Sequence, residues 1–253
     1  MVFILAAACF LQGLFAAQID SSFWQTEKSQ HFIVNYQAAP ANYLSQLTSQ
    51  AEIYYNSIVD DLGFRRFDFW SWDNRAKIYL YDDSGTFLSD TQRQSWAGAV
   101  VYVSNRTIKT FIGQAGFFDS ILPHELTHII FREFIGEKIY LPLWIDEGVA
   151  SAQEKSYLNT RLQIAKDLVA QNQYIKLDKF SEVRDPDLVQ AHIFYGQAAS
   201  LVVFLIRGQG RENFQDFCRK IRDGADWKSA LFSVYHFNSF DEFEQAWKEF
   251  VLK

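Results

Sequence analysis

Cysteine is scarce in this chain, and the scarcity limits how the fold can be held together. The 253 residues contain two cysteines, Cys9 and Cys218. If an N-terminal leader ending at Ala17 is removed, Cys218 is left alone and no intramolecular disulfide can form. The fold must then rely on its hydrophobic core. Cys218 lies among apolar residues of a predicted helix, a context typical of a small buried hydrophobe rather than a reactive thiol.

Clusters of basic residues, internal repeats and low-complexity tracts are also missing. The net charge is -6, and Lys and Arg do not gather into long runs. Because nucleic-acid binding needs a concentrated basic face, no nucleic-acid partner is expected. Without repeats or a long linker, the chain is expected to form one functional unit. Its 49% of apolar residues is the composition of a globular protein.

The N-terminal stretch, residues 2–17, is uncharged and mainly apolar, but it is too short to cross a bilayer comfortably. Polar residues follow at once, at 18–22. We predict that residues 1–17 are a cleaved secretory signal, although a basic start is missing. The protein is then secreted or periplasmic. An uncleaved membrane anchor is the main alternative, and only in that case is a membrane partner expected.

Secondary-structure signals divide residues 18–253 into two lobes. The first lobe, 18–116, alternates β-branched and aromatic runs with one long helical pattern. We predict strands at 31–36, 76–81, 98–103 and 108–112, and a helix at 42–62 that Gly63 ends. The second lobe, 117–253, is predicted to hold two site helices and further helices at about 158–171, 189–207, 211–222, 227–235 and 240–252. The expected fold class is α+β, with an N-terminal mixed β-sheet lobe carrying a packed helix and a C-terminal, mainly α-helical lobe.

Two local features have an ordinary and a more specific interpretation. The tetrapeptide 82–85, Asp-Asp-Ser-Gly, could open a calcium loop, but the further ligand spacing is absent, so a plain turn is predicted. Trp70 and Trp72 could form a surface binding patch, but we favour a loop that covers the core.

The chain is organised around His124-Glu125-Leu126-Thr127-His128. Two imidazoles four residues apart on a helix lie on one face, so both can reach a single ion while the Glu between them projects beside it. This pattern is typical of a zinc site in which the two His are ligands and the Glu is a base. Glu147 follows His128 by nineteen residues and could supply the third ligand of a His₂Glu catalytic site.

Helix boundaries support this arrangement. Asp119 or Ser120 is expected to cap the motif helix, Pro123 falls in its first turn, and Gly136 closes it. A second site helix is expected to begin near Pro142 and to carry Glu147.

The motif and its spacing resemble the gluzincin metallopeptidases, in particular their peptidase MA-like domains. The resemblance rests on His-Glu-x-x-His, eighteen residues, and then Glu147 within Trp-Ile-Asp-Glu-Gly-Val-Ala. The strand at 31–36, His-Phe-Ile-Val-Asn-Tyr, and the segment Phe194-Tyr195-Gly196 are also similar. The resemblance covers most of the chain after the leader. The resemblance implies a zincin-like fold with the active site between the two lobes, and a peptide or protein substrate.

The resemblance also implies roles for individual residues. His124, His128 and Glu147 would bind one Zn²⁺ per chain and leave a fourth position for water. Glu125 would accept the proton of that water and pass it to the leaving amine. Tyr195 is the candidate for stabilising the oxyanion, and His192, one turn earlier, is the alternative. Either of the two could instead be a packing residue.

Two further positions keep open alternatives. Asp146 could orient a zinc-bound imidazole, or it could simply favour the positive end of its helix. The backbone of Gly98, Ala99 and Val100 could pair with an extended substrate, because small residues allow close approach, or it could be an ordinary interior strand.

The absence of one sequence motif narrows the range of expected peptidase activities. Alanyl-aminopeptidase-like gluzincins carry Gly-x-Met-Glu-Asn upstream of the motif, and its Glu binds the substrate amine. The comparable strand here reads Trp-Ala-Gly-Ala-Val at 96–100, without Met or Glu. An endopeptidase is therefore expected. A carboxy-terminal or cell-wall peptide substrate, a non-peptide substrate of a zinc hydrolase, and a non-catalytic metal-containing binding or assembly module remain alternatives.

Overall fold

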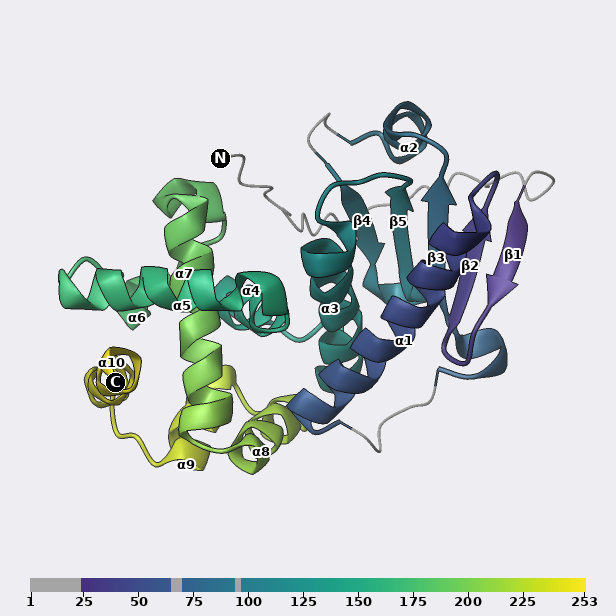
Figure 1. Cartoon of the computed structure of the whole chain (residues 1–253). Helices are drawn as coiled ribbons and strands as arrows, with labels where there is room; N and C mark the ends of the chain where they lie inside the picture. The colour runs from purple at the N-terminus through teal and green to yellow at the C-terminus, as the bar shows by residue number, and fades with distance from the viewer. Residues whose placement is uncertain (1–23, 65–69, 94–96) are drawn as a thin grey trace. The chain divides into compact units, whose positions relative to one another are not determined.

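A computed structural model describes residues 24–64, 70–93 and 97–253. The predicted signal peptide at 1–17, Phe69 beside the first tryptophan and Trp96 before the third predicted strand lie outside the described residues. The chain is α+β, with a five-stranded mixed sheet in its N-terminal part and a mainly helical C-terminal part (Figure 1). The predicted fold class is confirmed.

The sheet consists of β1 (Gln25–Lys28), β2 (Phe32–Tyr36), β3 (Ala76–Tyr81), β4 (Ala99–Tyr102) and β5 (Thr107–Phe111) in the order β1-β2-β3-β5-β4. The three central strands are parallel, and both edge strands run antiparallel to their neighbours. Val34, Ile78 and Ile108 lie side by side across the parallel strands and are fully buried. The four predicted strands are present within a residue or two, whereas β1, which is polar and exposed, was not predicted.

Two compact units divide the described residues, and the chain passes from one to the other inside two helices. The first unit runs to Tyr55 and from Trp70 to Glu125; the second covers 56–64 and 126–253. The passages fall within α1 (Ala41–Leu62) and α3 (Leu122–Ile135), both unbroken helices. As predicted, α1 ends before Gly63, which adopts a left-handed conformation with φ of 76°.

In the first unit, the N-terminal half of α1 packs against the sheet (Figure 1). Tyr55 makes an edge contact with the ring of Phe32 on β2 and stacks on His31. The Glu52 carboxylate accepts hydrogen bonds from the Ser29 hydroxyl (2.6 Å) and the His31 backbone (2.8 Å). These contacts fix the β1–β2 turn to the helix.

The predicted turn at 82–85 is only partly correct. A short helix, α2 (Ser84–Thr91), begins inside it. The Asp83 side chain accepts a hydrogen bond from the Thr86 N–H at 2.8 Å, so it acts as the N-cap of this helix. Phe87 on α2 is buried with Tyr81 and Val100 in a small apolar cluster.

The second unit is built from helices. Besides the C-terminal part of α3 it contains α4 (Leu143–Ala152), α5 (Lys155–Ala170), α6 (Leu177–Phe180), α7 (Ala191–Val203), α8 (Arg211–Arg222), α9 (Trp227–Tyr235) and α10 (Phe240–Leu252). A 3-10 turn, η5 (Pro186–Val189), precedes α7, which continues into a π-helical turn, η6 (Phe204–Gly208). The predicted helices are present, and the four-residue α6 was not predicted.

Helix α7 is the centre of this unit, because both α4 and α5 cross it and pack against it (Figure 1). A glycine stands at each crossing. A Cβ at Gly148 of α4 would lie 2.6 Å from the Ala198 carbonyl oxygen, and a Cβ at Gly196 of α7 would lie 2.7 Å from Ile164. The backbones can approach this closely only because neither residue has a side chain.

The segment Ala191–Gly208, which consists of α7 and η6, is long and apolar enough to cross a membrane by length and composition. Within the described residues, 67% of it is buried in the protein. A core helix has this pattern, and the position of α7 between α4 and α5 accounts for it.

The two tryptophans have separate environments. Trp70 is 2% exposed and contacts Phe32 and Tyr55, as expected of a residue that covers the core. Trp72 is 81% exposed. Cys218 is fully buried, as predicted, and burial raises the pKa of its thiol well above the ordinary value. This favours the unreactive thiol form.

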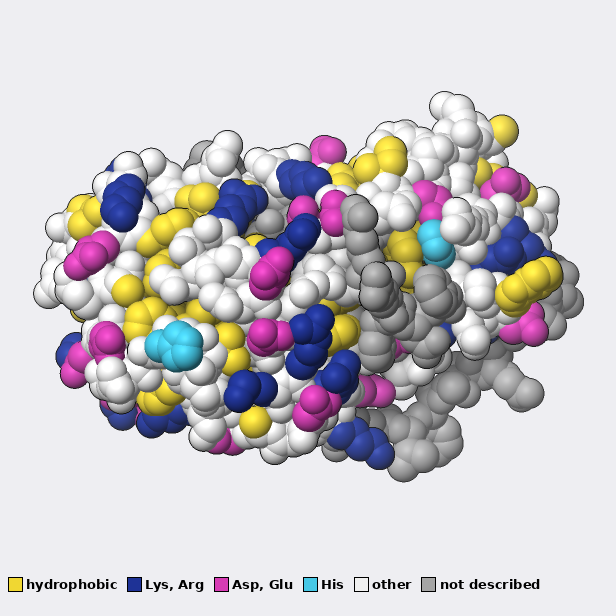
Figure 2. All heavy atoms as spheres, turned by 90° about the horizontal axis from the view of Figure 1, so that it is seen from below, with side chains coloured by type: hydrophobic (Ala, Val, Ile, Leu, Met, Phe, Trp, Pro, Cys, Tyr) yellow, Lys and Arg dark blue, Asp and Glu magenta, His cyan; other side chains and the backbone are white. Residues whose placement is uncertain are grey.

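Figure 2 shows one face of the protein. On it, Lys and Arg side chains are interspersed with Asp and Glu side chains over the described surface.

Candidate metal centre

The helix that carries the His-Glu-x-x-His motif begins differently from the prediction. A π-helical turn, η4 (Phe117–Ile121), runs directly into α3, and Gly116 precedes it with φ of 70°. The Ser120 N–H donates to the Gly116 carbonyl at 3.0 Å, so Ser120 is already inside the helical run. The prediction that Asp119 or Ser120 caps this helix is therefore wrong, because the helix starts three to four residues earlier.

Pro123 is accommodated where the π turn passes into α3. Proline has no N–H to continue the π-type bonding to the residue five positions earlier. That residue is Phe118, and its carbonyl instead accepts a hydrogen bond from the Tyr54 hydroxyl at 2.7 Å. At the other end, Gly136 closes the helix as predicted, with φ of 106° and its N–H bonded to the Arg132 carbonyl at 2.8 Å.

Helix α4 begins directly after Pro142, as predicted, and is buried from Trp144 to Ala152. The Trp144 indole N–H donates to the Ser181 hydroxyl at 3.0 Å. On the α7 side, Gly148 lies against Ala198. Glu147 is therefore positioned by a helix held tightly along its length.

The structure brings His124, His128 and Glu147 together. Each is 1% exposed, and one ligand atom from each lies within 4.8 Å of the others. Ligand atoms of one zinc lie about 2.0–2.2 Å from the ion and hence about 4 Å or less from each other, so small side-chain adjustments suffice for them to share it. Two imidazole nitrogens and a carboxylate oxygen are also the donor set of a His₂Glu catalytic site. The residues present fit a bound divalent metal.

The two ring nitrogens of His128 face two consecutive acidic residues of α4. Its Nε2 lies 3.8 Å from Oε1 of Glu147, and its Nδ1 lies 3.8 Å from Oδ1 of Asp146. One nitrogen is thus directed into the donor cluster and the other away from it. This supports the orienting role for Asp146, although its place in the first turn of α4 also suits the helix dipole.

Asp146 is charged despite being 1% exposed. Burial alone would raise its pKa, but the interactions with His128 and with the Arg132 guanidinium outweigh burial and lower the pKa to about 2. Arg132 was not singled out from the sequence. A signal was present, because an arginine four residues after His128 lies on the same buried helix face and needs a counter-charge there.

Glu125 is 4% exposed and follows His124 on α3. Its carboxylate is not part of the donor cluster. This is the arrangement expected of a base that stands beside a metal without ligating it.

Tyr195 and His192, the two candidates for the oxyanion donor, lie near the start of α7. Tyr195 is 6% exposed, whereas His192 is exposed. The Arg161 guanidinium lies 5.0 Å from the centre of the Tyr195 ring and binds both oxygens of Glu154, at 2.7 and 2.8 Å. Sequence analysis did not identify Arg161 or Glu154. Arg161 lies over the face of the Tyr195 ring, and Glu154 binds Arg161.

The predicted substrate strand, Gly98 to Val100, falls at an edge of the sheet. Among the described residues, β4 pairs with β5 alone, so its other edge carries backbone groups for an added strand. Val100 points inward and is buried. A Cβ at Gly98 would lie 2.6 Å from the end of the Gln114 side chain, which would have to move to make room for it.

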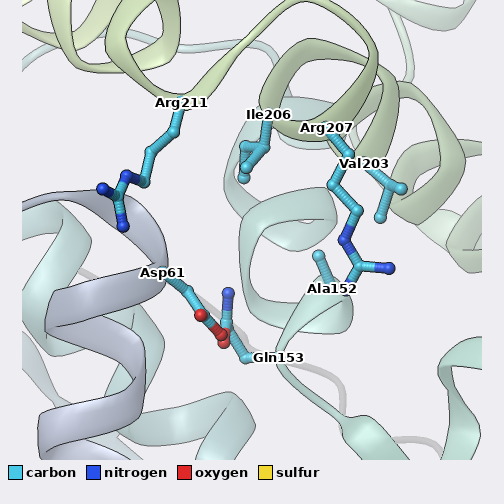
Figure 3. A pocket seen from close by; sticks show the side chains of 7 residues that line it. All are labelled: Asp61, Ala152, Gln153, Val203, Ile206, Arg207 and Arg211. Atoms are coloured by element: carbon cyan, nitrogen blue, oxygen red, sulfur yellow. The ribbon is translucent and has the colours of Figure 1, made fainter.

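A separate cavity of about 220 Å³ lies in the second unit (Figure 3). It is lined by Asp61, Ala152, Gln153, Val203, Ile206, Arg207 and Arg211. None of the residues predicted for the metal centre lines it. Arg211 also bonds to the Asp60 carbonyl at 3.1 Å.

An α+β chain with this donor cluster on two buried helices has the features of a metallopeptidase-like domain. A family model, described as the peptidase MA superfamily, matches residues 72–253, and the chain belongs to this superfamily. The predicted resemblance to peptidase MA-like domains is confirmed at this level. The search of curated proteins found no match.

Proposed function

We propose that this protein is a zinc-dependent peptidase of the gluzincin type that cleaves within peptide or protein chains. The observation that carries the proposal is the buried cluster of His124, His128 and Glu147 with Glu125 beside it. A structural zinc site would close the fourth position with a further protein ligand, and it would not need a buried glutamate between its histidines. Membership of the peptidase MA superfamily supports peptide hydrolysis over other reactions.

The residues divide the work as follows. His124 and His128 would hold the metal through neutral ring nitrogens, and Glu147 through its carboxylate. A bound Zn²⁺ supplies Lewis-acid chemistry, lowering the pKa of water towards neutrality and polarising a carbonyl. Glu125 accepts a proton on its carboxylate oxygen from the attacking water and delivers it to the departing amine. Burial of these side chains excludes bulk water and strengthens each polar interaction.

Substrate binding is assigned to the edge of β4, whose backbone at Gly98, Ala99 and Val100 would pair with an extended peptide. The Tyr195 hydroxyl is assigned to the developing negative charge on the cleaved carbonyl, with its ring held against Arg161. We further propose that residues 1–17 direct export, so that the enzyme acts in the periplasm or outside the cell.

The test compares wild type with Glu125→Gln, and with Glu133→Gln as a matched control on the same helix. We expect about one zinc per chain in all three proteins, because none of the changes removes a ligand. Cleavage of a broad peptide library is expected from wild type and the control and to be lost in Glu125→Gln, since an amide cannot accept the proton. Metal content is measured by elemental analysis and cleavage by mass spectrometry.

The outcomes separate the proposed features. If the wild-type protein contains no stoichiometric metal, the assignment of a metal centre is wrong. Metal without cleavage of any peptide would favour a binding module or a hydrolase of another substrate. Full activity of Glu125→Gln would exclude Glu125 as the base.

A further inference from the structure

Arg132 has its charge buried beside the proposed metal centre. It lies four residues after His128 on α3 and is 7% exposed. A guanidinium remains charged at any physiological pH, so a buried one must be compensated by a partner with good geometry.

Asp146 is that partner. The Arg132 Nε lies 3.0 Å from both carboxylate oxygens, and Nη2 donates to Oδ2 at 2.8 Å. The remaining arm, Nη1, donates to the Ile139 carbonyl at 2.7 Å. Ile139 belongs to the connection between α3 and α4, so one side chain fixes both that connection and the start of α4.

The fixed carboxylate faces His128 from the side opposite the donor cluster. Oδ1 of Asp146 lies 3.8 Å from Nδ1, and Oε1 of Glu147 lies 3.8 Å from Nε2 of the same ring. A carboxylate on the Nδ1 side favours the tautomer with its proton on Nδ1, which leaves the Nε2 lone pair available to a metal.

We infer that Arg132 is a positioning residue for the metal centre: by locking the Asp146 carboxylate it sets the orientation and tautomer of His128. The inference rests on the proposed function only in requiring that the cluster binds metal. Lysine at this position would keep the charge but lose the planar fork that engages both oxygens and the Ile139 carbonyl.

The experiment measures zinc affinity of the full chain by competition with a chromophoric chelator, and unfolding by urea. We expect Arg132→Met and Arg132→Lys to weaken zinc binding by about 10- to 100-fold, the usual cost of losing an outer partner of a ligand. Asp146→Asn is expected to weaken it similarly. The double variant Arg132→Met/Asp146→Asn should lose little more, because both residues act through one contact.

Two controls distinguish positioning from general stability. Arg161→Met breaks a partly buried arginine pair, with Glu154, that does not reach His128, so it should lower stability without changing zinc affinity. Arg207→Met removes an exposed arginine at the cavity of Figure 3 and should change neither.

If Arg132→Met does not fold, Arg132→Met/Asp146→Leu is measured, since replacing a buried ion pair by apolar residues commonly restores stability. We expect this variant to fold and still bind zinc weakly, because no carboxylate then faces Nδ1 of His128. Wild-type zinc affinity in the folded Arg132 variants would overturn the inference while leaving the proposed peptidase intact. Weakened zinc binding in a protein that cleaves no peptide would support the inference and contradict the proposed function.

Discussion

At the residue scale, His128 lies between the donor cluster and the ion pair of Asp146 and Arg132. Its two nitrogens face Glu147 and Asp146, which are consecutive in the chain. Consecutive residues on a helix point about 100° apart, so one ring placed against α4 can meet both carboxylates. The spacing of the motif predicted the first contact. The second could not be assigned from spacing alone, because it depends on how α3 and α4 pack.

Tyr195 is tested by removing only its hydroxyl. Tyr195→Phe keeps the ring that packs under Arg161. If the hydroxyl stabilises the oxyanion, turnover should fall by about a hundredfold with zinc content unchanged, the usual effect of losing one such donor. Steady-state cleavage of a peptide found in the library measures this. His192→Gln is the companion variant. If turnover falls in His192→Gln and stays at the wild-type level in Tyr195→Phe, the oxyanion donor is His192 instead of Tyr195.

Glu244 gives a pH-dependent prediction away from the metal centre. It is 5% exposed on α10 and accepts a hydrogen bond from the Leu177 N–H. Burial raises its pKa above 4.5, a shift that Asp241 reinforces and that the Leu177 bond, Lys176 and Lys248 oppose. A raised pKa means that the folded state binds the proton more tightly than the unfolded chain, so the charged form costs stability above that pKa.

Glu244→Gln keeps the acceptor and removes the charge. We expect a higher free energy of unfolding than wild type at pH 7, and a difference that shrinks as the pH falls below the ordinary glutamate value. Urea unfolding between pH 4 and pH 7 measures this. A difference that grows on acidification would contradict the assigned direction of the pKa shift.

At the element scale, α7 determines where α4 can lie. The contact of Gly148 with Ala198 allows α4 to approach closely enough to hold Glu147 in the donor cluster. The periodicity of the sequence predicted these helices well, because burial of one face repeats every three to four residues. It missed α6 and α2, which are too short for a periodic signal, and it placed the start of the motif helix too late.

Gly148→Ala should separate α4 from α7. The new Cβ meets a backbone carbonyl, which cannot rotate aside, so the two helices must shift. We expect a loss of about 1–3 kcal/mol in the free energy of unfolding, typical of overpacking, together with weaker zinc binding. Urea unfolding and chelator competition measure the two effects.

Gly196→Ala is the matched control for this crossing. Its Cβ would meet the side chain of Ile164 at the α5–α7 contact, where no proposed ligand lies. Stability should fall while zinc affinity stays at the wild-type level. Equal losses of zinc affinity in both variants would show that general loosening, rather than displacement of Glu147, is responsible.

At the scale of the whole molecule, metal binding is coupled to folding. His124 and His128 lie on the unbroken helix α3 and Glu147 lies on α4, so the three ligand atoms come together only in the folded chain. A metal bound only by the folded protein must stabilise it. Wild type at free zinc a hundredfold above its dissociation constant should gain about 2.7 kcal/mol over the metal-free protein.

Metal removal therefore provides a measurement independent of any substrate. Chelator should lower the urea midpoint of wild type and of Glu125→Gln, which retains all three ligands. The urea midpoint of His124→Ala should not depend on zinc at the same concentrations. A zinc-dependent midpoint that persists in His124→Ala would place the ion elsewhere in the protein.

The α+β class, most helices and strands, and the residues suited to bind a metal follow from the amino-acid sequence alone, because these depend on local periodicity and on fixed spacing along one helix. The packing of the folded chain was needed to show that Glu147 lies near His128, that Arg132 binds Asp146, and that Arg161 lies over the Tyr195 ring. These contacts join residues of different helices. Their geometry depends on close packing at glycines such as Gly148, which no local pattern encodes.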